Sequence, residues 1–339
     1  MPQARSKQVS LEVTPYYHCI SRCVRRAFLC GKDALTNKSF EHRRGWLESK
    51  LLEVSQNFMI DIASYAIMSN HYHVVLCVDK DGAANLSADE VIFRWHRLFK
   101  GNDLSKAYIT GEKLDPIKLE SLNTYIEVWR KRLTDISWFM RTINETIARW
   151  ANQEDECTGR FWEGRFKSQA LLDEKALLAC MAYVDLNPFR ANMASSLESS
   201  EYTSIQRRLA QDKSMLDGPG TENNMIDSSS FKQDLLSFSK QKSDDTESKK
   251  QYLPFSFSDY RSLLEWTAAK IRNSTVATTK PNLLRKNAFD DKVWLYSAQN
   301  FESQFKSLVG GLISLKSACS FFNFKRTVGF SACKQLVDT

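Results

Sequence analysis

The sequence predicts a mixed α+β fold, because segments with the apolar period of strands are interspersed with segments that have the period of helices. Strands are predicted at residues 16–24, 60–68, 72–78 and 159–172. Amphipathic helices are predicted around residues 46–54, 136–152 and 173–187. The chain has 339 residues, of which 42% are hydrophobic, so it is long and apolar enough to bury a sizeable core.

The boundaries of several elements follow from particular residues. Ser69-Asn70 supplies turn residues between the second and third strands, which predicts a hairpin. Gly164 is expected to bend the fourth strand. The last of these helices is expected to end near Asn187, because a residue that precedes a proline avoids helical angles.

Composition divides the chain into three parts. The first is a domain at residues 1–208, with a charged, helix-prone insertion at about 85–135. A polar, charge-mixed linker is predicted at residues 209–252, followed by a helical C-terminal region at 253–339. Within that region, helical periodicity is found at residues 260–271 and 301–319.

Charge and cysteine content narrow the class of protein. The 47 basic and 40 acidic side chains give a net charge of +7, which fits a polyanionic partner without demonstrating one. The eight cysteines include no C-x-x-C pair, so neither a zinc ribbon nor a redox motif is indicated. Apolar runs are too short for a membrane span, and residues 1–13 lack the apolar stretch of a secretory signal. We therefore expect a cytoplasmic protein with reduced, mostly buried thiols.

Two of the five histidines stand one residue apart, in His71-Tyr72-His73. Alternate residues of a strand share a face, so both imidazoles are expected to point the same way, and two imidazoles in that relation can close on one metal ion. Tyr72 and the alternate residues that follow it then face the core. An exposed pair of histidines at the start of a strand is the competing interpretation, and the pair alone favours it.

A second feature is the helical segment that contains Tyr183 and Asn187. These two residues are four apart, so they lie on the same side of a helix. Tyr183 stands at the border of the apolar arc, where its ring can pack while its hydroxyl reaches a cleft. A packing tyrosine whose hydroxyl bonds a neighbour is the competing interpretation, and the segment alone favours it.

One kind of chemistry links the two features. A tyrosine hydroxyl with its ordinary pKa of about 10 is a poor nucleophile. It can attack a phosphodiester when a divalent cation polarises the scissile phosphate and stabilises the leaving oxygen. The imidazoles of His71 and His73 and the amide oxygen of Asn187 would hold such a cation, and the oxygen-rich remainder of its shell suits Mg²⁺ or Mn²⁺.

Four sequence blocks together resemble the REP-associated tyrosine transposases, a branch of the HUH (His-hydrophobic-His) single-tyrosine transposases of bacteria. In chain order they are Tyr17-His-Cys-Ile-Ser-Arg-Cys-Val, Met68-Ser-Asn-His-Tyr-His-Val-Val-Leu, Gly159-Arg-Phe-Trp-Glu-Gly-Arg-Phe-Lys-Ser and Tyr183-Val-Asp-Leu-Asn-Pro-Phe-Arg-Ala. The match extends over about residues 14–205. Each block alone is weak, but the four in the family's order are specific.

The resemblance implies a ferredoxin-like core, in which helices back an antiparallel sheet. It also implies cleavage of single-stranded DNA at hairpin-bearing sites, with a 5′-phosphotyrosine link and a free 3′-OH, and strand transfer by the reverse reaction in DNA transposition. His71 and His73 match the family's metal-binding histidines. Tyr183 matches its nucleophile, and Asn187 matches the polar residue that completes the metal shell.

Three features depart from the family's pattern. Asn192 stands where glycine is frequent, but asparagine also tolerates left-handed backbone angles. Arg160 stands where a histidine is common, which leaves the metal shell unchanged. The insertion and everything after about residue 205 lie outside the shared pattern, so they could alter target choice or oligomeric state.

Basic and aromatic residues predict a DNA-binding surface. Residues 159–167 interleave cationic and aromatic side chains, as single-strand binding requires, although an ordinary strand with its charges outward has the same pattern. The candidate DNA-binding residues are Arg22, Arg25, Arg26, Arg160, Trp162, Arg165, Lys167 and Arg190. Arg190 could equally steady a phosphate or cap helix carbonyls.

Three functions are compatible with these residues. The first is a metal-dependent enzyme that nicks and joins single-stranded or hairpin DNA through Tyr183, and the joint presence of the histidine pair, Tyr183 and Asn187 favours it. The second is a ferredoxin-like protein that binds hairpin DNA or RNA without cutting it. The third is hydrolysis by a metal-bound water, which leaves no covalent adduct. The target hairpin and the choice between monomer and homodimer stay open.

Overall fold

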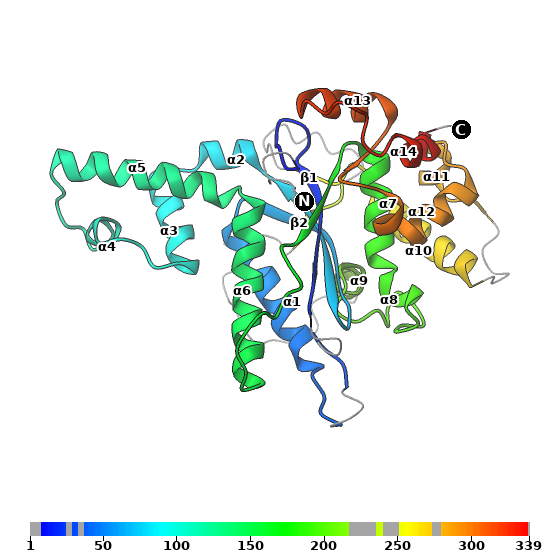
Figure 1. Ribbon diagram of the computed structural model, residues 1–339, viewed down its shortest axis with the longest axis horizontal. Coiled ribbons are helices and arrows are strands. Elements are labelled where there is room, and N and C mark those ends of the chain that lie inside the picture. Colours follow the sequence, from blue (N-terminus) through cyan, green and yellow to red (C-terminus); the bar gives the residue numbers. More distant parts are fainter. Residues whose placement is uncertain are drawn as a thin grey trace.

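The computed structural model describes residues 8–24, 29–32, 37–216, 235–239, 251–272 and 279–337. Within these residues the fold is α+β, with one five-stranded sheet and fourteen helices, which confirms the predicted class. Figure 1 shows the sheet near the centre, with helices on both of its faces and a helical arm that extends to one side.

The sheet has the strand order β2-β3-β1-β4-β5. Its strands are β1 (Tyr16–Arg22), β2 (Ile60–Ile67), β3 (His71–Val78), β4 (Lys167–Leu171) and β5 (Leu308–Val309). Strands β1 to β4 pair with one another in antiparallel fashion, whereas β5 runs parallel to β4. The hairpin predicted around Ser69-Asn70 is confirmed, because β2 and β3 pair directly on either side of it.

Two helices cover the face of the sheet to which Tyr72 points. They are α1 (His42–Asn57) and α6 (Ile136–Glu154), which pack on each other. The hydroxyl of Tyr72 donates a hydrogen bond to Oδ1 of Asn144 in α6 (2.8 Å), and Val74 and Leu76 are fully buried on the same side. This face is the core that the alternation of β3 predicts.

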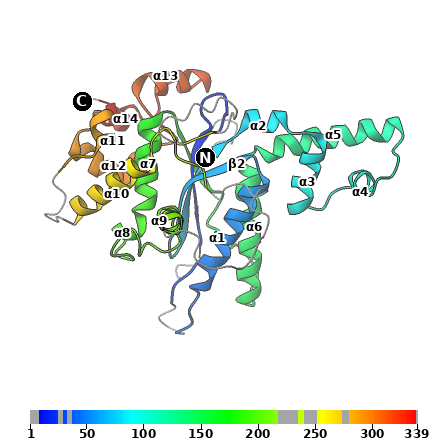
Figure 2. The same ribbon diagram turned by 180° about the vertical axis from the view of Figure 1, so that it is seen from behind.

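The opposite face carries α7 (Glu174–Asp185), which packs on β2, β3 and β4. A further helix, α12 (Asp291–Gln304), packs on α7. Figures 1 and 2 show α1 and α6 on one side of the strands and α7 and α12 on the other. Both faces of the sheet are therefore covered, and the side chains opposite Tyr72 in the pleat lie beneath α7.

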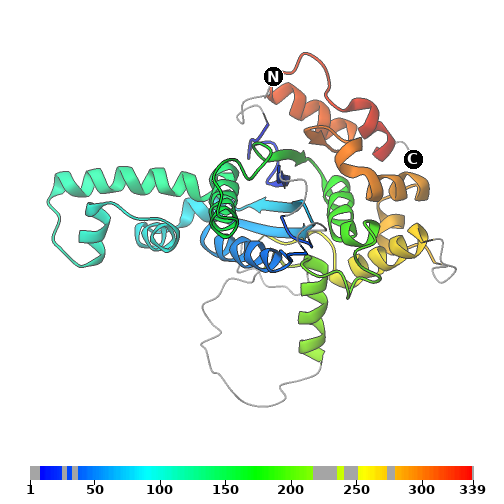
Figure 3. The same cartoon turned by 60° about the horizontal axis from the view of Figure 1, so that its bottom comes forward.

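Residues 80–133 form a four-helix arm, which begins a few residues before the insertion predicted at about 85–135. It contains α2 (Lys80–Asn85), α3 (Ala88–Leu98), α4 (Asp103–Ile109) and α5 (Pro116–Leu133). The arm projects away from the sheet (Figures 1 and 3). Within it the indoles of Trp95 and Trp129 are stacked, with ring centroids 5.4 Å apart.

Buried polar contacts fix both ends of α7. At its start, a carboxylate oxygen of Asp173 accepts a hydrogen bond from the Ala176 amide (2.9 Å), which satisfies a free donor of the first turn. At its end, the buried carboxylate of Asp185 accepts bonds from Tyr260 Oη (2.6 Å) and the Ile205 amide (3.0 Å). These partners belong to α10 (Phe257–Ile271) and α9 (Ser204–Leu216). A short helix, α8 (Asn187–Arg190), follows directly.

The C-terminal region contains more than the predicted helices. The helix expected at 260–271 is confirmed as α10, and α11 (Asn282–Lys286), α13 (Leu312–Phe321) and α14 (Phe330–Val337) complete the region. The helical segment expected at 301–319 is wrong, because α12 ends at Gln304 and the chain enters β5. The amide of Ala170 donates to the Ser307 carbonyl (2.8 Å), so pairing with β4 replaces the helical bonds that the local spacing suggested.

The strand predicted at 159–172 is shorter than expected, because only residues 167–171 form β4. Gly159 has a φ of 110°, a left-handed conformation that interrupts a strand. Trp162 makes only an isolated bridge with Cys23. The apolar alternation before β4 therefore reflects the burial of side chains, and the backbone there does not form the continuous hydrogen bonds of a strand.

Other expectations concern the linker and the thiols. Helix α9 continues to Leu216, over the first residues of the predicted linker, while residues 217–234 and 240–250 lie outside the described part. Leu236 is buried, and its amide donates to the Ile62 carbonyl (2.8 Å).

All eight cysteines are free, and all except Cys157 are buried, as predicted. Among the helices described, none combines the length and apolar character needed to cross a bilayer.

Candidate active site

His71 and His73 lie on the same face of β3, as the strand period predicts. Their ring centroids are 4.8 Å apart. His71 is partly exposed at the hairpin, and its Nδ1 bonds Asn70 Oδ1 (2.6 Å). His73 is fully buried beneath α7, so the competing interpretation of two exposed histidines is wrong for this residue.

Tyr183 lies on α7, on the same face of the sheet as the two histidines. Its ring contacts the ring of His73 edge-on, with centroids 5.4 Å apart, and only 6% of the residue is exposed. The packing of α7 on β3 therefore brings together residues that are far apart in the sequence. The phenol and the imidazole form one cluster.

Asn187 starts α8, one turn after Tyr183, and is 7% exposed. Its Nδ2 and the Nε2 of His73 are both buried, with no hydrogen-bond partner among the described residues. Buried polar atoms without partners are costly unless a ligand or water satisfies them. A half turn of the Asn187 amide would present its oxygen in place of its nitrogen. The donor set therefore fits a bound cation.

The described residues contain no group of three His, Cys, Asp or Glu side chains that could hold a metal ion. A cation at this site would therefore depend on the amide of Asn187 in addition to the two imidazoles. Such a set leaves positions open for phosphate oxygens and water, as catalytic metal sites do.

Burial keeps the histidines of the site neutral. It lowers the pKa of His71 to about 4, and the positive charge of Arg22 lowers it further in the same direction. The pKa of His73 is well below its usual value, mainly through burial and then through the neighbouring histidines. A neutral imidazole has the free lone pair that a metal ligand needs.

Arg190 and burial shift the pKa of Tyr183 in opposite directions. Burial raises the pKa of the phenol, whereas the guanidinium of Arg190 lowers it through its charge and a hydrogen bond. The guanidinium carbon lies 4.2 Å from the centroid of the Tyr183 ring, and Nη1 donates to the Gln299 carbonyl of α12. The phenol is therefore protonated at neutral pH and has a cation beside it.

Residues that the sequence did not single out complete the cluster. His18 of β1 is fully buried, and its ring centroid is 6.2 Å from that of Tyr183. Phe301 of α12 contacts both Tyr183 (5.9 Å) and His18 (6.0 Å), so α12 covers the phenol. His18 belongs to the first of the four sequence blocks, but only the pairing of β1 with β3 reveals its place. The helical periodicity at residues 301–319 begins at Phe301, but it did not indicate that this ring would cover Tyr183.

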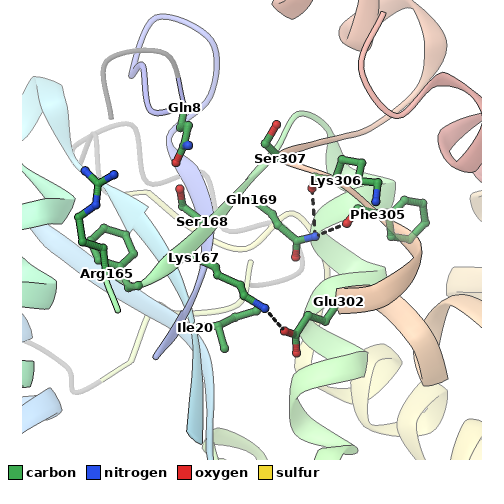
Figure 4. A pocket seen from close by; sticks show the side chains of 11 residues that line it. Gln8, Ile20, Arg165, Lys167, Ser168, Gln169, Glu302, Phe305, Lys306 and Ser307 are labelled. Carbon is green, nitrogen blue, oxygen red and sulfur yellow. Dashed lines mark hydrogen bonds and ion pairs between the residues drawn. The ribbon is translucent and has the colours of Figure 1, made fainter. Parts of the chain in front are cut away.

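The predicted DNA-binding residues lie in different environments. Arg22, Arg160, Arg165 and Lys167 are exposed. Arg165 and Lys167 line a cavity of about 400 Å³ that also includes Lys306 (Figure 4), and Lys167 Nζ is 3.2 Å from Glu302 Oε1. Arg25 and Arg26 lie outside the described residues.

Trp162 is placed inside the molecule. It is 8% exposed, and its indole N–H donates to the Asn144 carbonyl (2.7 Å). Its ring packs against Tyr72, with centroids 5.8 Å apart. The indole thus serves the packing of α6 on the sheet in this structure.

Comparison with known proteins gives one structural likeness. A solved structure described as "Structure of the REP associates tyrosine transposase bound to a REP hairpin" matches with a TM-score of 0.37 and 13% sequence identity. The match covers 67% of this chain and 96% of that one. No protein-family model matches the sequence, and no curated protein matches it.

Proposed function

We propose that the protein is a transposase-like endonuclease that cleaves and rejoins single-stranded DNA at hairpin-bearing sites, with Tyr183 as the nucleophile. The edge-on contact between Tyr183 and His73 carries the proposal. It places a phenol beside an imidazole whose Nε2 is buried and without a partner among the described residues. A packing tyrosine alone would not need that neighbour.

The sheet topology supports the same proposal. Strands β1 to β4 are joined in the order strand-helix-strand-strand-helix-strand, with the arm inserted between β3 and α6. They lie in the order β2-β3-β1-β4, all antiparallel, with α1 and α6 on one face. We infer that this is a ferredoxin-like core, to which β5 adds a fifth, parallel strand.

In the proposed reaction, Tyr183 Oη forms a bond to the phosphorus of a phosphodiester, and the bond from phosphorus to the 3′ oxygen breaks. The products are a 5′-phosphotyrosine and a free 3′-OH. The phenol loses one proton and the 3′ oxygen gains one, so the step consumes no further reactant. Attack by a 3′-OH on the phosphotyrosine reverses the step and joins the strands.

Residues of this chain supply the remaining requirements. His71, His73 and Asn187 would hold Mg²⁺ or Mn²⁺, which when bound would neutralise charge on the scissile phosphate. Arg190 stabilises the ionised phenol, because its guanidinium lies over the ring. Arg22 and Arg165, which are exposed, would neutralise phosphates of the strand.

The test is a covalent adduct assay with single-stranded hairpin oligonucleotides, best drawn from the DNA that flanks the gene. With Mn²⁺, the wild-type protein should form a denaturation-resistant protein–DNA adduct, and Tyr183→Phe should form none. Tyr296→Phe is the matched control, because Tyr296 is an exposed tyrosine on neighbouring α12. EDTA should abolish the adduct, and added Mn²⁺ should restore it.

Two results would point to other functions. Cleavage without an adduct, unchanged in Tyr183→Phe, would indicate hydrolysis by water. Salt-sensitive hairpin binding that is indifferent to EDTA, with no cleavage, would indicate a binding protein. An adduct that persists in Tyr183→Phe would exclude this residue as the nucleophile.

A further inference from the structure

His18 and His73 face each other within the buried part of the sheet. Both are fully buried, and His18 Nε2 lies 3.0 Å from His73 Nδ1. The ring planes are inclined by only 20° and the centroids are 5.2 Å apart, so the rings lie edge to edge with the two nitrogens between them. Two neutral imidazoles at this distance share one hydrogen, so one nitrogen donates and the other accepts.

The other ring nitrogen of His18 reaches Gln169 on β4. His18 Nδ1 lies 2.8 Å from Gln169 Oε1. The Gln169 side-chain amide donates in turn to the carbonyls of Phe305 (2.8 Å) and Lys306 (3.0 Å), which precede β5 (Figure 4). Turning this amide over would set its oxygen against two carbonyl oxygens. The two carbonyls therefore fix the amide orientation.

The orientation of the Gln169 amide determines which nitrogen carries the hydrogen in both His18 and His73. Gln169 Oε1 has no hydrogen to give, so His18 must carry its proton on Nδ1. The Nε2 of neutral His18 is then an acceptor, so His73 must donate from Nδ1. The Nε2 of His73 is consequently left with a bare lone pair, and it is the atom without a partner among the described residues.

We propose that His18 and Gln169 are positioning residues for His73: through this relay they fix its tautomer and ring orientation and present its Nε2 lone pair to a divalent cation. This relay is the series of hydrogen bonds that begins at the carbonyls of Phe305 and Lys306 and ends at His73. The C-terminal region therefore affects how strongly His73, on β3, binds a metal ion. The inference rests on the proposed function only in taking His73 as a ligand. Outer partners of metal-bound histidines commonly act in this way.

The first measurement is made without metal. The full chain is labelled with ¹⁵N-histidine and stripped of metal, and long-range ¹H–¹⁵N correlation spectra report the tautomer of each ring. His18→Gln identifies the His18 signals by their loss. The wild-type protein should show Nδ1–H on both His18 and His73. A proton on His73 Nε2 would overturn the proposal.

The second measurement is the Mn²⁺ affinity by titration calorimetry. His18→Leu should bind Mn²⁺ about 10- to 100-fold more weakly than the wild type, because His73 can then carry its proton on either nitrogen. His18→Gln should retain affinity, since a glutamine can both accept from His73 and donate to Gln169. His96→Gln is the control, because His96 bonds Ser105 in the arm.

Gln169→Leu keeps the test decisive if His18→Leu fails to fold. It should weaken Mn²⁺ binding and yield a mixture of His73 tautomers. Unchanged affinity in a folded His18→Leu or Gln169→Leu protein would overturn the proposal. Failure of the wild type to bind Mn²⁺ would refute the metal site of the proposed function, whereas the tautomer of His73 would still decide whether the relay exists.

Discussion

The guanidinium of Arg190 lies over the ring of Tyr183, 4.2 Å from the centroid, and is held there by the carbonyl of Gln299. A cation in this position lowers the pKa of the phenol and so offsets part of the increase that burial causes. The proposed nucleophile and the charge beside it thus come from consecutive helices, while the residue that holds the guanidinium comes from the C-terminal region.

Arg190→Ala is expected to slow adduct formation. Without the guanidinium the pKa of Tyr183 rises further, and less phenolate is available at pH 7. We expect a rate about tenfold lower, which corresponds to a lost interaction of roughly 1.4 kcal/mol. Single-turnover adduct formation with hairpin DNA and Mn²⁺ measures it. Arg261→Ala, on the exposed side of α10, should leave the rate unchanged, and equal rates for both variants would contradict the role of Arg190.

Asp185 is expected to make the folded state less stable as the pH rises. Burial raises the pKa of its carboxyl from 3.8 to about 6, so the fold disfavours the ionised form. Its contribution to stability is complete below about pH 4 and is lost as the pH rises through about 6. Relative to Asp185→Asn, the wild type should lose up to roughly 3 kcal/mol of unfolding free energy between pH 4 and pH 7.

Urea denaturation of the wild type and of Asp185→Asn at each pH, both in EDTA, measures this difference. The comparison cancels the titration of all groups that the two proteins share. A constant difference between pH 4 and pH 7 would show that the Asp185 carboxyl titrates in the folded state as it does in the unfolded chain.

Glu302→Gln is expected to strengthen DNA binding. In the wild type, Glu302 pairs with Lys167 and adds a negative charge near Tyr183. Its removal frees Lys167 for a phosphate, so the affinity for single-stranded DNA should rise about threefold and its salt dependence should steepen by about 0.7 in the log–log slope. Titrations at several salt concentrations measure both. Glu265→Gln on α10 is the matched control, and weaker binding by Glu302→Gln would contradict the expectation.

The variant Trp162→Phe distinguishes a role of this indole in packing from a role in DNA contact. The substitution removes the hydrogen bond to the Asn144 carbonyl and part of the ring that packs on Tyr72. We expect the unfolding free energy to fall by about 2 kcal/mol, with DNA affinity unchanged. Denaturation and DNA titration of the same sample measure the two effects. A large loss of DNA affinity at unchanged stability would instead support the stacking role predicted from the sequence.

The fold elements that depend on local pattern could be predicted. The alternation before and after Ser69-Asn70 predicted the β2–β3 hairpin, and the apolar spacing of α6 and α7 predicted both helices. The left-handed tolerance of Asn192 also agrees with its φ of 55°. These features depend on neighbours in the sequence, so the sequence contains enough information to predict them.

The site could be predicted only in part. The strand period placed His71 and His73 on one face, but the contact of Tyr183 with His73 requires α7 to pack on β3. His18 and Phe301 enter the cluster through strand pairing and helix packing between distant segments. The periodicity at 301–319 failed for the same reason, since the pairing of β5 with β4 overrides a local preference.

The pairing of β5 with β4 also bears on how the molecule is made. A nascent chain that has emerged only through α9 already contains β1 to β4 and Tyr183. It lacks the strand beside β4, the carbonyl partners of Gln169 and the helix that covers α7. A ribosome must therefore synthesise the chain through β5 before the histidines and the phenol acquire their final surroundings, and a product terminated before β5 would contain these residues without that arrangement.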